Sequence, residues 1–368
     1  MANIVFVTWD GGGNVPPAVG IAVEMQRRGD TVQFSATSSS GPPSRRRDCA
    51  SSLIPEARGG GRPPLRKSGQ WECSHPCPRS VRTALEDLIS IVRRGPADLV
   101  VIDCVLRGVL RKAAQAEFRR AVLVHSFFGM ARFTMGTGPI ARLRGRATTG
   151  PWGGADLGLV ATLRDLDPDG RGDLPSIIRY TGPVWQGHPR PSIRNPGKPR
   201  VLVSLSTVWF PRQVKVLQNI LDSLRGANLE AIVTTGPAVD PSELRAPANA
   251  TLHRYLPHAE IMPTVELVIG HGGHATTMAA LAHDIPMIIL PMHRVMDQPI
   301  IGRAVQAAGA GRVLAKMSPP QCIRRTIDEL LHDGPHRTAA ARLGAEIRRR
   351  DGAAVAADHL AEVLALSE

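Results

Sequence analysis

The chain has 368 residues, a formal net charge of +13 at pH 7 and an aromatic content of only 4%. This length exceeds one ordinary core and suits two domains of about 150 to 200 residues each. Nucleic acid is disfavoured as a partner, because aromatic residues are few and the basic residues, nearly all arginine, are spread along the chain; a phosphate-bearing ligand or an anionic membrane surface stays compatible with the charge.

The sequence shows no membrane span or export signal. No run of about 18 uncharged apolar residues occurs, which is the length that a spanning helix needs. The first apolar run, Ile4 to Val7, lacks the basic flank and the length of a signal peptide. Five cysteines, an odd number at scattered positions, do not form a disulfide framework. We therefore expect a cytoplasmic protein with free thiols and no transmembrane segment.

The first half of the chain predicts short strands that alternate with helices. It opens with a strand, Asn3 to Thr8, followed by the glycine turn Gly11 to Gly13 and an amphipathic helix, Val15 to Arg28. Further apolar, β-rich runs are expected to be strands: Thr31 to Ser35, Asp98 to Ile102 with a helix after it, and Ala121 to Val124. This alternation is typical of a parallel sheet covered by helices.

Residues 38–78 interrupt the pattern. They are rich in Arg, Pro, Ser and Gly, contain three of the five cysteines and show almost no hydrophobic periodicity. Three interpretations are open: a mobile acceptor loop, a disordered insertion or a shifted reading frame, of which the last two are favoured. Cys73 and Cys77, with His75 between them, superficially resemble a zinc site, but no second ligand pair lies at zinc spacing, so no metal is expected.

A second series of strands and helices begins at Arg200. The expected strands are Val201 to Leu205, Leu229 to Val233, Leu267 to Ile269 and Met287 to Leu290, and the helices end at Leu224, His283 and Ala308. The Pro-rich stretch Gln186 to Pro199 cannot form either element. We therefore expect an α/β protein of two Rossmann-like, doubly wound domains that face a central cleft. The expected boundaries are residues 1–183 for the N-terminal domain, 184–199 for the linker and 200–368 for the C-terminal domain. The pattern is helical from Pro319 to the end, and the last helices are expected to cross back to the N-terminal domain.

The strongest motif, His271 to Thr277, follows a strand and opens a helix. Its glycines let the backbone approach a ligand closely, and the free N–H groups and positive end of the helix attract an anion such as a diphosphate. A polar pair, Asp297 and Gln298, follows the next strand and can exchange hydrogen bonds with sugar hydroxyls. A dehydrogenase is disfavoured, because Gly11 to Gly13 does not complete a G-x-G-x-x-G and no acidic residue ends the next strand.

Three segments resemble the family 1 glycosyltransferases of GT-B fold, especially the bacterial natural-product and macrolide-type branch. They are FVTWDGGGNVPPAVGIA at residues 6–22, VLVSLST at residues 201–207, and residues 254–299, which contain HGGHATT and end in DQP. The resemblance covers nearly all of the chain except residues 38–78. It implies an inverting transfer of a sugar from a nucleotide diphosphate donor to a small hydrophobic acceptor, a natural-product aglycone, without a cofactor and without a metal.

The resemblance also implies roles for residues of the C-terminal domain. The glycine-rich loop would hold the diphosphate, Asp297 and Gln298 the sugar hydroxyls, and Tyr255 and Leu256 would flank the nucleobase. Plant relatives bind both ribose hydroxyls with a Glu where this chain has Ala279, so a dTDP-sugar is favoured over a UDP-sugar. The expected donor-binding residues are Ser206, Thr207, Tyr255, Leu256, His271, Gly272, Gly273, Thr276, Asp297 and Gln298.

The catalytic base is not evident from the sequence. The family's base is a His directly after the first glycine turn, where this chain has Asn14, and an amide has no useful proton affinity near pH 7. Asn14 can orient an acceptor. Asp103, which matches the family's supporting Asp, is the first candidate for the base, followed by His125 and Asp10. Each of the three can also be an ordinary loop residue.

Phe127, Phe128 and Phe133 belong to the densest cluster of aromatic and thioether side chains in the sequence. They are expected either to line an apolar acceptor pocket or to belong to a helix that packs in the protein core, and the sequence favours neither alternative over the other. Two further hypotheses stay open: a non-catalytic relative that binds the nucleotide sugar or assists a partner enzyme, and an epimerase that acts on the donor alone. The oligomeric state is open as well, and a homodimer is compatible with the sequence.

Overall fold

The computed structural model describes residues 1–9, 12–37, 97–116, 118–135, 152, 154–185, 188–294, 297–332 and 334–366. The anomalous stretch at residues 38–78 lies outside the described residues, and so do Asp10, Gly11 and three of the cysteines. The two described cysteines, Cys104 and Cys322, form no disulfide. Within the described ranges, no helix has the length and apolar character needed to cross a membrane.

The N-terminal half forms a six-stranded parallel sheet in the order β2-β1-β3-β4-β5-β6. Strands β3 and β4 are apolar runs buried along their whole length, as helices on both faces of a parallel sheet require. The strand order has its switch point between β1 and β3, because β2 is added on one side of β1 and all later strands are added on the other. The carboxyl ends of β1 and β3 are therefore the expected place of a ligand site. The elements are β1 (Asn3–Trp9), α1 (Val15–Arg27), β2 (Thr31–Thr37), β3 (Leu99–Asp103), α4 (Arg107–Gln115), β4 (Arg120–Val124), α5 (Phe128–Met135), β5 (Leu157–Val160), η2 (Pro168–Arg171) and β6 (Ile178–Tyr180).

The C-terminal half repeats this plan in the order β12-β11-β10-β7-β8-β9, again with parallel pairs only among the described strands. Its switch point lies between β7 and β10, whose last residues, Ser204 and Gly270, are paired. The elements are β7 (Arg200–Ser204), α7 (Gln213–Leu224), β8 (Glu230–Thr234), η3 (Pro241–Glu243), β9 (Ala250–His253), α8 (His258–Ile261), η4 (Met262–Thr264), β10 (Leu267–Gly270), α9 (His274–Ala282), β11 (Met287–Ile289), α10 (Gln298–Ala307), β12 (Gly311–Val313), α11 (Pro320–Leu331), α12 (Pro335–Arg348) and α13 (Gly352–Ala365).

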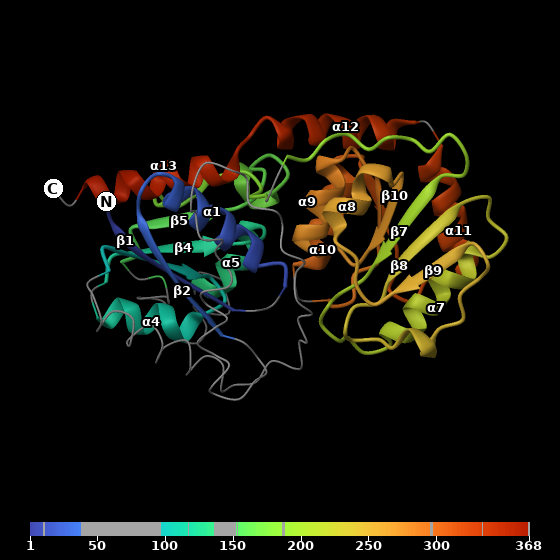
Figure 1. The fold of residues 1–368 in the computed structure, drawn as a ribbon, viewed down its shortest axis with the longest axis horizontal. Helices are drawn as coiled ribbons and strands as arrows, with labels where there is room; N and C mark the ends of the chain where they lie inside the picture. Colours follow the sequence, from blue (N-terminus) through green and yellow to red (C-terminus); the bar gives the residue numbers. More distant parts are fainter. Residues whose placement is uncertain are drawn as a thin grey trace.

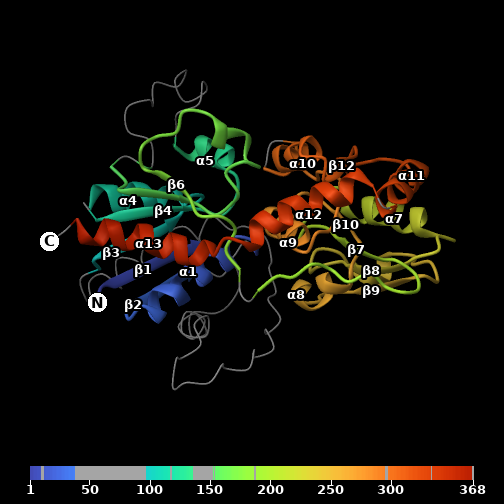
Figure 2. The ribbon, with the colours of Figure 1, turned by 90° about the horizontal axis from the view of Figure 1, so that it is seen from above.

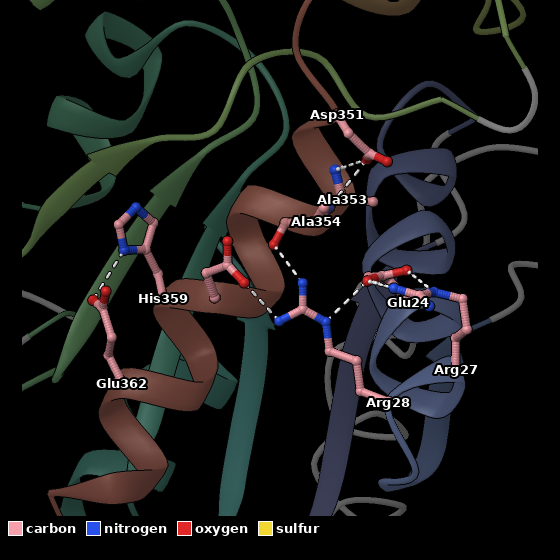
Figure 3. A network of polar contacts seen from close by, with 9 residues as sticks. Glu24, Arg27, Arg28, Asp351, Ala353, Ala354, His359 and Glu362 are labelled. Carbon is pink, nitrogen blue, oxygen red and sulfur yellow. Dashed lines mark hydrogen bonds and ion pairs between the residues drawn. The ribbon is translucent and has the colours of Figure 1, made fainter.

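The last helix, α13, leaves the C-terminal half and packs on the N-terminal half, as Figures 1 and 2 show. Asp351 caps it by accepting hydrogen bonds from the backbone N–H groups of Ala353 (3.1 Å) and Ala354 (3.0 Å). Arg28, at the end of α1, donates to Asp358 at 2.7 Å and to the Ala354 carbonyl at 3.1 Å (Figure 3). The end of the chain therefore ties the two sheets together on the side where α12 and α13 lie.

The α/β class of two doubly wound domains predicted from the sequence is confirmed, because both halves are parallel sheets with covering helices. Four strands were not predicted: β5, β6, β9 and β12, which have only three or four residues each. Strands of this length make a weak pattern, and β10 and β11, which are as short, were recognised because each belongs to a continuous apolar run next to a predicted helix. These strands lie at or next to the edges of the sheets, where pairing with a neighbouring strand defines them.

Candidate active site

The loops after the strands of one sheet touch the loops after the strands of the other. Gly13, after β1, lies against Ala275 of α9, since a Cβ on Gly13 would be 3.4 Å from the Ala275 Cβ. Gly12 has φ +85°, and its Cβ would be 3.1 Å from Oγ1 of Thr207. The left-handed backbone and the lack of room both favour glycine there. Two motifs that are far apart in the sequence therefore meet at one interface.

Asp103, the last residue of β3, is the centre of a buried polar cluster and is only 1% exposed. Its Oδ2 accepts a hydrogen bond from Nδ2 of Asn14 at 3.0 Å and lies 3.1 Å from Nδ1 of His125. Its Oδ1 accepts from the backbone N–H of Val105 at 3.0 Å. Asn14 also donates to the hydroxyl of Thr8 at 3.3 Å. Both oxygens of Asp103 are thus occupied, which suits a residue that orients its neighbours.

The charges of Asp103 and His125 stabilise each other. Burial raises the pKa of Asp103, but the positive charge of His125 and the hydrogen bonds from the Val105 backbone and the Asn14 side chain outweigh it and hold this pKa below its usual range. Burial lowers the pKa of His125, but the Asp103 carboxylate outweighs it and raises this pKa well above its usual range. The resting pair is therefore ionised near neutral pH, and His125 must lose a proton before it can accept one.

Cys104 follows Asp103 and lies beside the same pair. One ligand atom from each of Asp103, Cys104 and His125 lies within 4.8 Å of the other two, a spacing that a metal ion could bridge. Burial raises the pKa of the Cys104 thiol, which disfavours the thiolate that a metal needs. Since the carboxylate oxygens of Asp103 also have hydrogen-bond partners, these residues suit an ion pair better than a metal. The expected absence of a metal stays a prediction.

The glycine-rich loop between β10 and α9 has a conformation that only its glycines permit. Gly272 has φ +84°, and its Cβ would be 2.9 Å from the backbone oxygen of Gln298. A Cβ on Gly273 would be 2.6 Å from Nε2 of His271. The loop therefore packs closely on the start of α10 while the imidazole of His271 lies against it. His274, the residue after this loop, begins α9, and the sequence predicts that an anion binds at the N–H groups of this helix end.

Both imidazoles of this loop are uncharged at neutral pH. Burial lowers the pKa of His271 to about 4, although a hydrogen bond with the backbone of Ser204 opposes the shift. Burial and then the charge of His125 lower the pKa of His274 to about 3. His274 was not predicted as a site residue, yet it is 8% exposed and its Nε2 has no hydrogen-bond partner among the residues that the structure describes. Its place at the start of a glycine-opened helix was the available signal.

Asp297 and Gln298 lie side by side after β11 but have different surroundings. Oδ2 of Asp297, a partly exposed residue, accepts a hydrogen bond from Oγ of Ser126 at 2.7 Å. Gln298 is 3% exposed, and its Oε1 accepts from the backbone N–H groups of Met292 (2.8 Å) and His293 (3.1 Å). Gln298 therefore holds the loop that precedes it, and only its NH₂ group is left for a ligand.

The other predicted donor-binding residues differ in their exposure and contacts. Ser206 is 7% exposed and its hydroxyl accepts from the backbone N–H of Val208 at 3.0 Å, so it closes its own turn. Thr207 is exposed and faces Gly12. Tyr255 is 64% exposed, which leaves its ring available for stacking on a base, whereas Leu256 packs partly on the core. Thr276 is half-buried in the first turn of α9.

The structure corrects the acceptor-pocket interpretation for two aromatic residues. Phe127 and Phe128 are 0% and 1% exposed and belong to core clusters. A side chain without accessible surface cannot line a pocket, so the core alternative holds for both. Phe127 also packs edge-on against His274, with ring centroids 6.0 Å apart. Asp10 and the side chain of Phe133 lie outside the described residues.

Comparisons with known proteins find several relatives of this chain. Residues 218–362 match the family of the erythromycin biosynthesis protein CIII-like, C-terminal domain. The 4'-demethylrebeccamycin synthase of Lentzea aerocolonigenes is 28% identical over 212 residues, which cover 55% of this chain and 49% of that protein. The demethyllactenocin mycarosyltransferase of Streptomyces fradiae is 28% identical over 165 residues, which cover 44% and 35%. The chain spans about half the length of the curated relatives it matches.

Among solved structures, the calicheamicin glycosyltransferase CalG4 has a TM-score of 0.73 and 20% identity to this chain, and the match covers 99% of this chain and 98% of that one. At this identity the likeness concerns the fold. It confirms the expected arrangement of two doubly wound domains, the GT-B fold.

Proposed function

From the premise that this chain is a relative of the family 1 glycosyltransferases, in their bacterial natural-product branch, we propose that it transfers a sugar from a nucleotide diphosphate to a small hydrophobic acceptor, with inversion at the sugar carbon. One observation carries the proposal. The His125–Asp103 pair at the switch point of one sheet lies beside the glycine-opened helix α9 of the other. One interface thus combines a group that can hold a proton with a site for an anion.

The donor diphosphate would lie at the start of α9. The helix end and its free N–H groups attract the negative charge, and the neutral imidazole of His271 and the hydroxyl of Thr276 can donate hydrogen bonds to it. These groups would stabilise the diphosphate as it leaves with the electron pair of its bond to the sugar carbon. We therefore propose that transfer does not depend on a divalent metal.

His125 is the residue that we propose as the base. Its side chain is 15% exposed, whereas that of Asp103 is 1% exposed, so His125 is the better placed of the two to reach an acceptor. Because Nδ1 faces Asp103, Nε2 is the nitrogen that would take the acceptor's proton as the new oxygen–carbon bond forms. Asp103 would hold the ring and stabilise its charged form. Asn14 would serve by holding Asp103 in place.

The proposals for the nucleotide and the acceptor rest on one side chain of α9 and on the names of the matched proteins. Ala279 of α9 presents a methyl group where a carboxylate would be needed to bind two ribose hydroxyls, which supports dTDP over UDP. The matched proteins are named for rebeccamycin, demethyllactenocin and calicheamicin, and by that likeness we propose a natural-product aglycone as the acceptor. The proposed setting is antibiotic biosynthesis in the cytoplasm.

A titration with dTDP, UDP and NADH, followed by thermal unfolding and calorimetry, tests the donor site, because a ligand that binds only the folded state raises its melting temperature. We expect dTDP to bind and His271→Ala to abolish that binding. Binding of NADH in place of both pyrimidine nucleotides would refute the proposal. Donor binding without transfer to any acceptor of a broad panel would instead favour the non-catalytic alternative, which Asn14 motivates.

A further inference from the structure

Ser126, at the end of β4, makes a hydrogen bond across the interface between the two halves of the chain. Its Oγ donates to Oδ2 of Asp297 at 2.7 Å, and Ser126 is 0% exposed. A short hydrogen bond to a carboxylate is stronger than one between neutral groups. Asp297 precedes α10 as its N-cap, but its side chain does not cap that helix. The carboxylate therefore depends on Ser126 for its orientation.

The segment that carries Ser126 is held on both sides. His125 is paired with Asp103 at 3.1 Å, and Phe127 packs edge-on against His274. The backbone N–H of Phe128 donates to the buried carboxylate of Asp167 at 2.5 Å, which also accepts from the hydroxyl of Tyr180 at 2.9 Å. Ser126 is thus fixed in place by its neighbours and cannot easily turn away when a ligand arrives.

The acceptor atoms that could read sugar hydroxyls are consequently few. Oδ2 of Asp297 is engaged by Ser126, and Oε1 of Gln298 is engaged by two backbone N–H groups. The other carboxylate oxygen of Asp297, Oδ1, has no hydrogen-bond partner among the described residues. A free carboxylate can bind two neighbouring hydroxyls, one on each oxygen; because the Ser126 hydroxyl already takes one lone-pair direction of Oδ2 from inside the interface, a sugar hydroxyl must compete with it there but not at Oδ1.

We propose that Ser126 is a specificity-determining residue, which reaches from the opposite domain to occupy one oxygen of Asp297 and so restricts Asp297 to one hydroxyl of the donor sugar. This inference rests on the proposed function, because it needs a nucleotide sugar in the site. It couples sugar recognition to the contact between the domains, since Asp297 has this restricted form only when Ser126 lies against it.

The test measures the affinity of dTDP-glucose and of its monodeoxy analogues, one for each ring hydroxyl, with dTDP alone as the reference. In the wild-type chain one analogue should lose about tenfold in affinity, and Asp297→Asn should remove that loss; tenfold corresponds to about 1.4 kcal/mol. In Ser126→Ala a second, adjacent hydroxyl should become important as well. Thr162→Val is the matched control, because the hydroxyl of Thr162 contacts Met278 across the same interface at 3.8 Å and does not touch Asp297.

The inference would be overturned if the wild-type chain lost affinity for two analogues lacking adjacent hydroxyls and Asp297→Asn removed both losses, whether or not Ser126→Ala folds. An unchanged pattern in folded Ser126→Ala, or the same change in Thr162→Val, would also overturn it. If neither dTDP nor dTDP-glucose and its analogues bind, the proposed function fails together with the inference. If dTDP binds and only the hydroxyl pattern differs from expectation, the proposed function stands and the inference alone fails.

Discussion

Asn14 donates a hydrogen bond to Asp103 over 3.0 Å, although the two residues are 89 positions apart. Asn14 follows the first glycine turn, where the family that this chain resembles has its basic His. In this chain the carboxylate partner is retained, and the imidazole beside it comes from His125 instead. The site therefore keeps an imidazole–carboxylate pair while its imidazole is supplied by a different strand end.

Replacement of Asn14 by Ala should destabilise the fold. Nδ2 of Asn14 donates to Asp103, to Thr8 and to the carbonyl of Trp9 within a buried cluster, so its loss leaves a carboxylate without one of its donors. We expect a decrease of about 1 to 3 kcal/mol in the free energy of unfolding, measured by urea denaturation. Asn219→Ala is the matched control, because Asn219 is also buried but donates to a neutral carbonyl, and its loss should be smaller.

Transfer should depend on pH through His125. The Asp103 carboxylate raises the pKa of His125 well above its usual range, so the base is protonated at low pH and the rate should rise as pH increases through that raised pKa. His125→Ala should lower kcat by about 10²- to 10⁴-fold. Asp103→Asn should lower kcat and move the acid limb to lower pH, because burial alone lowers the pKa of His125.

The profile of kcat against pH in the wild-type chain and these variants is the measurement. His253→Ala, in the edge strand β9, is the control and should retain the wild-type profile. An acid limb that stays at the same pH in Asp103→Asn would show that His125 is not the titrating group.

Binding of a nucleotide sugar should take up protons. In the free chain burial holds the pKa of His271 at about 4 and that of His274 at about 3. A bound diphosphate would raise both values, so affinity should increase as pH falls from neutral, by at most tenfold per pH unit for each proton taken up. Calorimetry of dTDP-glucose in buffers of different ionisation enthalpy measures this uptake. The uptake should be reduced in His274→Ala and unchanged in His283→Ala, at the opposite end of α9.

The contact of α13 with the N-terminal half should depend on shape more than on surface charge. A Cβ on Gly352 would be 2.3 Å from the backbone oxygen of Pro183, so Gly352→Val cannot be accommodated without moving the start of α13. We expect this variant to lose more than about 2 kcal/mol of stability, as overpacked sites do. Asp358→Ala removes only the exposed partner of Arg28 and should cost about 0.5 kcal/mol. Similar melting temperatures for the two variants would contradict this view.

Removal of divalent ions should leave transfer unchanged. The end of α9 and the neutral His271 are the groups proposed to stabilise the leaving diphosphate, and none of them needs a metal. Initial rates before and after treatment with a chelator measure this. A rate that falls on chelation and returns with added Mg²⁺ or Zn²⁺ would direct attention to the cluster of Asp103, Cys104 and His125 instead.

The sequence by itself determined the elements and the class of fold. Apolar, β-rich runs and amphipathic helices are local patterns, so β1, β3, β4, β7, β8, β10 and β11 are recognisable from the order of the residues alone. The glycine-rich loop is recognisable for the same reason, since its glycines, strand and helix are consecutive. Short edge strands such as β6 and β12 were missed because pairing, not pattern, defines them.

Only the tertiary structure decided the chemistry of the site. Asp103 and His125 were both candidates for the base, and their relative exposure, which depends on packing, is the reason why we propose His125. Burial also places Phe127 and Phe128 in the core, an alternative that the sequence could not decide. Ser126 and Asp297 are 171 residues apart and meet because the two domains dock. Contacts of this kind and the pKa values they set arise from long-range burial, for which a local pattern carries no signal.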